Sequence, residues 1–249
     1  MKPSLDWLVD RPIAHRGLHD RAKGIVENTI SAALAAIEAK CSIECDVQVT
    51  ADGEAVVFHD FTLERLTEGA GRADEKPADA INKLVLRGSS DRVPRLSDWL
   101  AVIGGRTGAV IEIKSRFDGD LRLLHRVIEV TRGYHGPFAL KSFDPALIMK
   151  LRESAPDIPR GIVATNDYKD RGHASLPRAE IHAMANLLHF SETKPDFLSW
   201  HVSDLPCAAP FLCRTQLELP VVAWTVRTAE ERGRASLHAD QMVFEGFNP

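Results

Sequence analysis

Short apolar runs alternate with amphipathic stretches along most of this chain, a pattern typical of strands followed by helices. The apolar runs predict strands at 12–15, 42–50, 55–59, 109–113, 137–140, 161–164, 196–201, 221–225 and 241–244. Apolar residues three and four apart predict helices at 29–40, 96–103, 119–134, 144–153 and 228–237. Residues 61–95 are expected to form a loop, and the tract that ends at 188 to be helical or irregular.

Strands that alternate with helices over the whole length predict a parallel sheet. The turn Ala51-Asp52-Gly53-Glu54 joins two of the strands into a hairpin, which we count as one barrel strand. About eight strand–helix units remain, and 249 residues suit a TIM (β/α)8 barrel, which typically takes about 250. A doubly wound open sheet is the alternative, but no Gly-x-Gly-x-x-Gly follows the first strand.

Charged residues and histidines stand where several buried strands should end, and burying them is costly unless each has a partner. Glu44 and Asp46 are two residues apart, so their side chains point to the same face of a strand. Glu112 lies inside the next apolar strand, and the three carboxylates are candidate ligands for a divalent cation. Oxygen ligands without cysteine or clustered histidine favour Mg²⁺, Ca²⁺ or Mn²⁺ over zinc. A buried ion pair with Lys114 is the alternative role for Glu112.

His15 and His59 are the candidate acid–base pair, because imidazole titrates near neutral pH. Arg16 and Lys114 supply positive charge beside them, which suits a phosphate. Together with a metal they would neutralise the charge that develops at phosphorus, as phosphodiester cleavage requires. A nucleophilic serine elbow and a P-loop are both absent from the sequence.

Eight short motifs together resemble the glycerophosphodiester phosphodiesterase family. They are HRG (15–17), ENT (27–29), IECDVQVTADGEAVVFHD (43–60), TLERLTEG (62–69), PRLSDWL (94–100), IEIKS (111–115), SFDP (142–145) and AWTV (223–226). The resemblance implies one TIM-barrel domain over 1–249, with an excursion after the second strand at about 47–95. It also implies metal-dependent hydrolysis of deacylated phospholipids to glycerol 3-phosphate and an alcohol.

The family pattern also assigns the individual residues. It makes Glu44, Asp46 and Glu112 the ligands of one divalent cation, with Glu27 beside the metal site. It makes His15 and His59 the acid–base pair, while Arg16 and Lys114 contact the phosphate. It allows the neighbouring glycerol hydroxyl to attack phosphorus first, which gives a cyclic phosphate that water then opens.

The chain departs from the family pattern at three places. Val26 stands where many members have proline. Lys141 stands where glutamine is frequent, and it is expected to add positive charge for the substrate at the barrel mouth. The divergent segment 238–249 leaves Glu245 as the substitute for the usual acidic residue. Trp224 is a candidate substrate contact, although packing in the core is the default role for a tryptophan at a strand end.

The net charge of −4 and the lack of a basic run argue against a nucleic-acid partner. No stretch reaches the ~20 apolar residues that span a bilayer, and the first residues lack the features of a signal peptide. We therefore expect a cytoplasmic protein whose partner is a small-molecule glycerophosphodiester. The spacings of the four cysteines fit reduced thiols rather than a disulfide framework; they are Cys41, Cys45, Cys207 and Cys213.

Other functions on the same barrel stay open. A lysophospholipase D predicts an apolar groove at the barrel mouth, and a lyase predicts that a cyclic phosphate accumulates. A non-catalytic binding protein would be free to lose His15, His59 or a metal ligand, and all are present. A metal-dependent sugar isomerase does not need Arg16 and Lys114 around an anion. The sequence leaves the head group, the preferred metal, the order of the two histidines and the oligomeric state open.

Overall fold

The computed structural model describes residues 4–168 and 175–249, and these hold nine strands in one hydrogen-bonded sheet. The strand order is β1-β9-β8-β7-β6-β5-β4-β2-β3, and β1 also pairs with β2. Strand β3 is the hairpin partner of β2, and the other eight strands have the order of a closed (β/α)8 barrel. The predicted TIM barrel is confirmed, and the doubly wound alternative is wrong. The strands are β1 (Ile13–Ala14), β2 (Ser42–Val49), β3 (Ala55–Val57), β4 (Ala109–Ile113), β5 (Phe138–Ser142), β6 (Arg160–Ala164), β7 (Phe197–His201), β8 (Val221–Val226) and β9 (Gln241–Phe244).

The chain divides into two compact units, which are described separately. One comprises residues 13–140 with residue 248, and the other comprises 1–12, 141–247 and 249. The single domain expected over 1–249 stays a prediction. Two stretches lie outside the described residues: 1–3, at the start that is expected not to be a signal peptide, and 169–174, in the tract expected to be helical or irregular.

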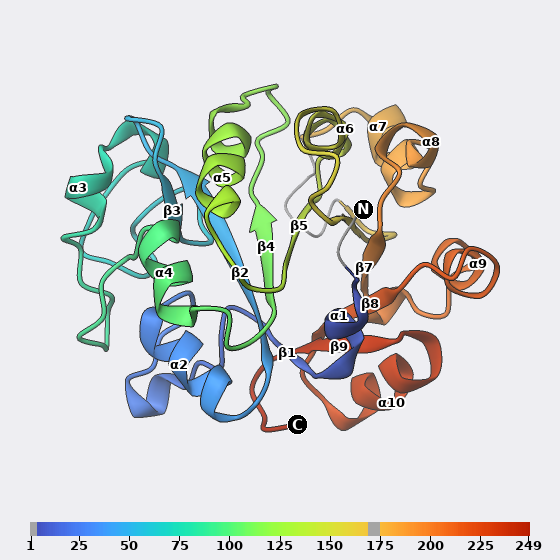
Figure 1. Ribbon diagram of the computed structural model, residues 1–249, viewed down its shortest axis with the longest axis horizontal. Helices are drawn as coiled ribbons and strands as arrows, with labels where there is room; N and C mark the ends of the chain where they lie inside the picture. The colour runs from blue at the N-terminus through green and yellow to red at the C-terminus, as the bar shows by residue number, and fades with distance from the viewer. Residues whose placement is uncertain (1–3, 169–174) are drawn as a thin grey trace. The chain divides into compact units, whose positions relative to one another are not determined.

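The first unit follows the predicted order of strands and helices. Strand β2 pairs in parallel with β1 and β4 and antiparallel with β3, so the predicted hairpin is present (Figure 1). Thr29 caps the alanine-rich helix through a hydrogen bond from the Ala32 amide to its hydroxyl. Gly104 ends another helix in the left-handed conformation. The helices of this unit are η1 (Arg21–Lys23), α2 (Ile30–Glu38), η2 (Ala73–Glu75), α3 (Ala78–Ile81), α4 (Leu96–Ile103) and α5 (Arg122–Arg132).

The excursion between β3 and α4 is packed rather than a simple loop. It contains η2, α3 and several isolated bridges, such as Thr62 with Arg72. Its apolar residues form a buried cluster with residues of the barrel layer, and such a cluster fixes an irregular segment as firmly as a helix would. The cluster consists of Val26, Val56, Phe58, Leu63, Leu66, Ala73, Ile81, Leu86 and Val93.

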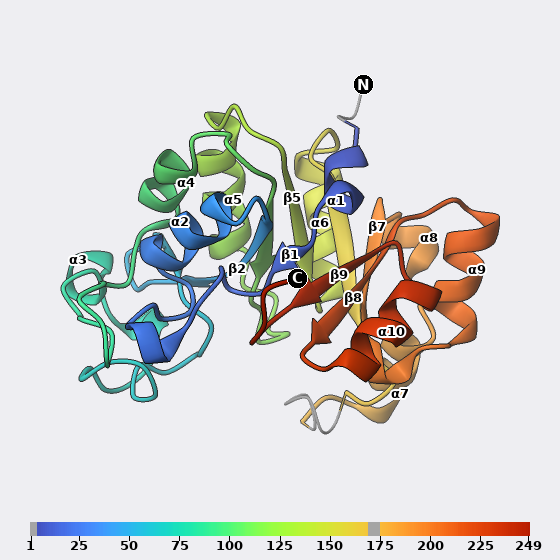
Figure 2. The same cartoon turned by 90° about the horizontal axis from the view of Figure 1, so that it is seen from below.

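The second unit continues the alternation of strands and helices. Strand β7 pairs in parallel with β6 and β8, and β8 pairs in parallel with β9. Helix α10 packs on β8 and β9 (Figure 2). It begins with a capping box between Thr228 and Glu231. No helix among the described residues is long and apolar enough to cross a membrane. The helices are α1 (Asp6–Asp10), α6 (Pro145–Ser154), α7 (Arg178–Ala185), α8 (Phe190–Thr193), η4 (Val202–Asp204), α9 (Ala208–Gln216) and α10 (Ala229–His238).

An ion pair fastens the β2–β3 hairpin to α5. Arg126 donates to both carboxylate oxygens of Glu54, from Nε at 2.7 Å and from Nη2 at 2.9 Å. Burial raises the pKa of Glu54, but the hydrogen bonds from Arg126 outweigh burial and hold the pKa below its ordinary value. The hairpin is therefore held to the helix by a carboxylate that must be charged.

Replacing Glu54 with glutamine is expected to lower the free energy of unfolding by about 1 to 2 kcal/mol at neutral pH. Because the folded-state pKa is depressed, this stability is present above the ordinary pKa of about 4.3 and is lost as pH falls through the lower folded-state value. Urea unfolding of wild type and Glu54→Gln across this pH range measures the difference. A difference that stays constant at acidic pH would show that the charge of Glu54 is not its cause.

Candidate active site

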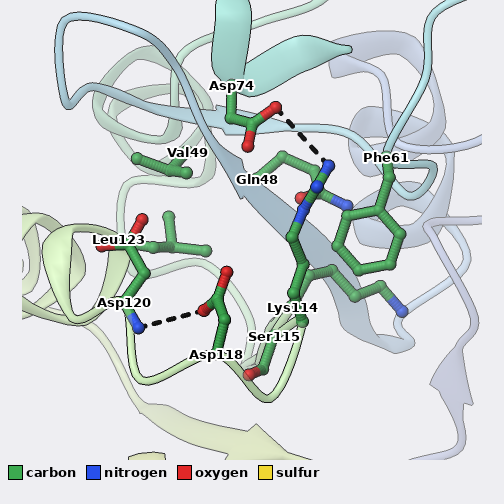
Figure 3. A pocket seen from close by; sticks show the side chains of 10 residues that line it. Gln48, Val49, Phe61, Asp74, Lys114, Ser115, Asp118, Asp120 and Leu123 are labelled. Carbon is green, nitrogen blue, oxygen red and sulfur yellow. Dashed lines mark hydrogen bonds and ion pairs between the residues drawn. The ribbon is translucent and has the colours of Figure 1, made fainter. Parts of the chain in front are cut away.

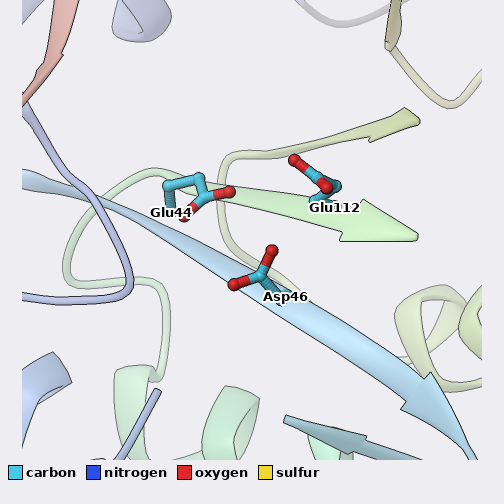
Figure 4. A group of neighbouring side chains, drawn as sticks. All are labelled: Glu44, Asp46 and Glu112. Carbon is cyan, nitrogen blue, oxygen red and sulfur yellow. The ribbon is translucent and has the colours of Figure 1, made fainter. Parts of the chain in front are cut away.

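Three carboxylates converge on one side of the sheet, two from the middle of β2 and one from near the carboxyl end of β4. The two-residue alternation of β2 puts Glu44 and Asp46 on one face, and the parallel register sets Asp46 opposite Glu112. One oxygen from each of the three residues lies within 4.8 Å of the others (Figure 4). The side chains that the sequence assigned to one cation site therefore do come together.

The three carboxylates are buried, and two of them, Asp46 and Glu112, meet the ammonium group of Lys114. Its Nζ lies 2.8 Å from Asp46 Oδ1 and 2.5 Å from Glu112 Oε1, so the predicted alternative of a Glu112–Lys114 ion pair is present. Burial lowers the pKa of Lys114, but these carboxylates raise it above its ordinary value. Burial raises the pKa of Asp46, but Lys114 and His59 outweigh burial and hold it well below. Both groups are therefore charged at neutral pH.

The carboxylate cluster fits a divalent cation. Its donors are all oxygens, which Mg²⁺, Ca²⁺ and Mn²⁺ prefer. Two oxygens bound to the same ion at about 2.4 Å are at most about 5 Å apart, and the separations here stay within that limit. The three carboxylates carry three negative charges, and Arg16 and Lys114 carry two positive charges. One negative charge is therefore left for an additional cation to balance. The donor set does not identify the ion.

The turn after β1 places Arg16 against the cluster. Its backbone has a φ of +57°, which is unusual for a residue other than glycine, and its amide donates to Glu44 Oε2 at 3.1 Å. The side chain then reaches Asp46, with Nε 3.2 Å from Oδ2. Gly17 is required next because its φ is +80° and a Cβ would lie 2.7 Å from the Cβ of Ala32 on α2. The HRG motif is thus a tight turn after β1 that packs against β2 and α2.

Both predicted acid–base histidines lie near the carboxylates but differ in their surroundings. His15 is 8% exposed, and its Nε2 is 4.0 Å from Glu44 Oε2. His59 follows β3, and its Nδ1 is 2.7 Å from Asp60 Oδ1. Hydrogen bonds from His59 and Arg65 keep the pKa of Asp60 below its ordinary value despite burial, so Asp60 is ionised and can only accept. Nδ1 of His59 therefore carries the proton, which leaves Nε2 as the exchangeable nitrogen.

Glu27 lies next to Arg16; its expected place beside a metal ion stays a prediction. Its Oε1 accepts from Arg16 Nη1 at 2.7 Å, and both of its oxygens accept from Arg65. Burial raises the pKa of Glu27, but the hydrogen bonds from Arg65 and the charge of Arg16 lower it to about 2. Glu27 is therefore an ionised group that contacts the cations around the cluster.

The model of the glycerophosphoryl diester phosphodiesterase family matches residues 15–244, nearly the whole chain. The chain belongs to this family. It is accordingly an enzyme of the glycerophosphodiester phosphodiesterase class, and the barrel and the carboxylate cluster described above are those of a family member.

Relatives and solved structures agree with this assignment. The glycerophosphodiester phosphodiesterase of Caldanaerobacter subterraneus is 30% identical over 182 residues, covering 69% of this chain and 73% of the relative. Glycerophosphodiester phosphodiesterase 1 of Bos taurus is 27% identical over 91% of this chain and 74% of its own length. An Oleispira antarctica phosphodiesterase, solved with the product sn-glycerol-3-phosphate, superposes with a TM-score of 0.76 at 20% identity, covering 96% and 93% of the two chains. At that identity the superposition shows the fold alone.

Two predicted substrate contacts of this phosphodiesterase belong to the second unit. Lys141 is buried in β5, with 2% of its surface exposed. Trp224 on β8 donates from Nε1 to the Ser199 carbonyl at 2.9 Å, and its ring meets Phe143 and His201 edge to face at 5.4 and 4.9 Å. These contacts agree with a packing role for Trp224. A substrate contact for Lys141 or Trp224 stays a prediction.

A pocket beside Lys114 adds polar groups to the first unit (Figure 3). The guanidinium of Arg116 lies over the Phe61 ring, 4.9 Å from its centre, and pairs with Asp74 at 3.5 Å. Asp118 lines the same pocket and accepts from the Asp120 amide at 3.0 Å. The pocket therefore offers charges of both signs close to Lys114.

Three side chains of the site were not assigned by the sequence analysis. Asn28, with a φ of +58°, donates to Asp46 Oδ2 at 3.0 Å and accepts from the Asp46 amide at 3.2 Å. Asp60 directly follows His59 and binds its ring. Arg65 joins Asp60 to Glu27. The three residues lie in the motifs ENT, HD and TLERLTEG, which could have marked them as candidates. No local periodicity, however, shows which partner each side chain meets.

Proposed function

We propose that the chain hydrolyses glycerophosphodiesters to glycerol 3-phosphate and an alcohol, using one divalent cation and two histidines. The observation that carries this proposal is the convergence of Glu44, Asp46 and Glu112 beside two cationic side chains. Membership of the family supports the substrate class, and so does the glycerol 3-phosphate bound to the Oleispira antarctica protein.

In this proposal Glu44, Asp46 and Glu112 hold the cation, which when bound polarises a phosphate oxygen as a Lewis acid. Arg16 and Lys114 bind the same phosphate as a planar fork and a point charge. Their contacts with Glu27, Asp46 and Glu112 fix them in place before substrate arrives. A charge that develops on phosphate oxygens therefore meets cations that need little rearrangement.

His15 and His59 move the protons. One removes the proton of the attacking oxygen, and the other protonates the alcohol as its bond to phosphorus breaks. The attacking oxygen belongs to water or to the neighbouring glycerol hydroxyl. In the second case water opens the cyclic phosphate with the two histidines in exchanged roles, so that each regains its starting protonation state. Asp60 holds the Nδ1–H of His59, which fixes the tautomer and the orientation of its ring.

The proposal is tested by measuring the release of glycerol 3-phosphate from glycerophosphocholine, glycerophosphoethanolamine and glycerophosphoinositol. Each substrate is assayed with Mg²⁺, Ca²⁺ or Mn²⁺ and with EDTA. We expect metal-dependent release from at least one substrate, which also identifies the head group. Accumulation of a cyclic phosphate would show that the reaction stops after the first step. A folded protein that releases product from no substrate with any metal would contradict the proposal, and lysophospholipids would be tested next.

A further inference from the structure

Arg65 lies in the excursion after β3, between two buried leucines. Leu63 and Leu66 are 0% and 1% exposed and belong to the apolar cluster of the excursion. Their burial fixes the backbone on both sides of Arg65, while its own side chain is 45% exposed. The packing of the excursion therefore determines where the guanidinium group lies.

The guanidinium of Arg65 binds two carboxylates at once. Nε and Nη2 donate to Asp60 at 2.5 and 3.0 Å, and Nη1 and Nη2 donate to Glu27 at 3.0 and 2.8 Å. Each pair is a two-pronged contact, which fixes orientation as well as distance. Isolated ion pairs on a surface contribute little to stability, but a fork that holds two partners determines their relative positions.

Each of these carboxylates in turn holds a group that the proposed reaction uses. Glu27 Oε1 accepts from Arg16 Nη1 at 2.7 Å, and Asp60 Oδ1 binds His59 Nδ1 at 2.7 Å. The contacts form one continuous chain with Arg65 at its centre. Without Arg65, the two ionised carboxylates would have less positive charge between them and would repel each other.

We propose that Arg65 is a positioning residue that fixes Arg16 through Glu27 and His59 through Asp60, so that the excursion sets the distance between the phosphate-binding cation and an acid–base group. This inference rests on the proposed function, which supplies the roles of Arg16 and His59. Lysine cannot replace Arg65 because a single ammonium group cannot form a planar fork with each carboxylate.

The first test compares Arg65→Gln, Arg65→Lys and the matched control Arg87→Gln. Arg87 is equally exposed, lies in the same excursion and pairs with Glu68 at 2.9 Å, away from the carboxylates that Arg65 binds. We expect Arg65→Gln to lower kcat about 10- to 100-fold on the substrate that wild type hydrolyses best, with a smaller change in KM. Arg65→Lys should restore only a minor part of the lost kcat. The kcat of Arg87→Gln should stay within about twofold of the wild-type value. Similar urea midpoints for Arg65→Gln and Arg87→Gln would separate positioning from global stability.

The second test asks whether Arg65 acts through Asp60. In a double-mutant cycle, Arg65→Gln should have a much smaller effect in an Asp60→Asn background than in wild type. Nitrogen NMR of the His59 ring gives a readout that needs no turnover: one tautomer, with Nδ1 protonated, in wild type and a mixture in Arg65→Gln.

Additive effects, full rescue by lysine or an unchanged His59 tautomer in Arg65→Gln would overturn the role of Arg65. Failure of wild type to hydrolyse any glycerophosphodiester would instead contradict the proposed function. The tautomer measurement distinguishes the two failures, because it reports on His59 with or without a substrate.

Discussion

Alanine in place of His15 or His59 is expected to remove nearly all turnover and leave the fold intact. Each imidazole carries one of the two proton transfers, and losing a positioned acid or base costs about 10²- to 10⁴-fold in rate. Neither histidine belongs to the apolar cluster of the excursion, and His59 is only partly buried. The measurement is kcat for glycerol 3-phosphate release by His15→Ala and His59→Ala at saturating metal.

His125→Ala is the matched control, because His125 is exposed on α5 and contacts none of the proposed groups. A glycerol phosphodiester with a nitrophenol leaving group assigns the roles, since nitrophenolate leaves without a proton. The variant that lacks the general acid should recover most of its rate on that substrate, and the variant that lacks the base should not. Turnover comparable to wild type in either alanine variant would exclude that histidine from the reaction.

Asparagine in place of Asp46 is expected to weaken cation binding and to lower turnover by about 10²- to 10⁴-fold. Asp46 is the carboxylate at the centre of the cluster, with Lys114 at 2.8 Å and Arg16 at 3.2 Å. The substitution removes one proposed metal ligand. It also leaves the two buried cations, Arg16 and Lys114, with less negative charge around them. Metal stabilisation of the transition state is worth several kcal/mol, which corresponds to the expected loss of turnover. Titration calorimetry with Mn²⁺ measures the affinity, and product release measures the turnover.

Glu54→Gln serves as the control for Asp46→Asn, because it removes a different ion-paired carboxylate next to the β2–β3 hairpin and should retain turnover. If Asp46→Asn does not fold, wild type treated with EDTA gives the same information without a mutation. EDTA should abolish product release, and excess divalent cation should restore it. Full activity in EDTA, or unchanged Mn²⁺ affinity in folded Asp46→Asn, would contradict the proposed cation site.

Local signals predicted most of the elements of this barrel. The helix predicted at 96–103 and the strand predicted at 109–113 coincide with α4 and β4, because a 3.6-residue period and a short apolar run are properties of neighbouring residues. The segment at 61–95 was expected to be a loop, since its glycines and prolines break both periods. Its apolar residues nevertheless form a cluster, and their contacts come from parts of the chain too distant for a local pattern to show.

The sequence by itself determined the fold class, the family and the residue types at the strand ends, including the shared face of Glu44 and Asp46. Tertiary structure alone decided which partners these side chains meet. The register of β2 against β4 sets Asp46 opposite Glu112, and the excursion brings Arg65 to Glu27, 38 residues away. The physical reason is that the alternation of a strand is fixed within a few residues, whereas strand register and side-chain contacts depend on how distant segments pack.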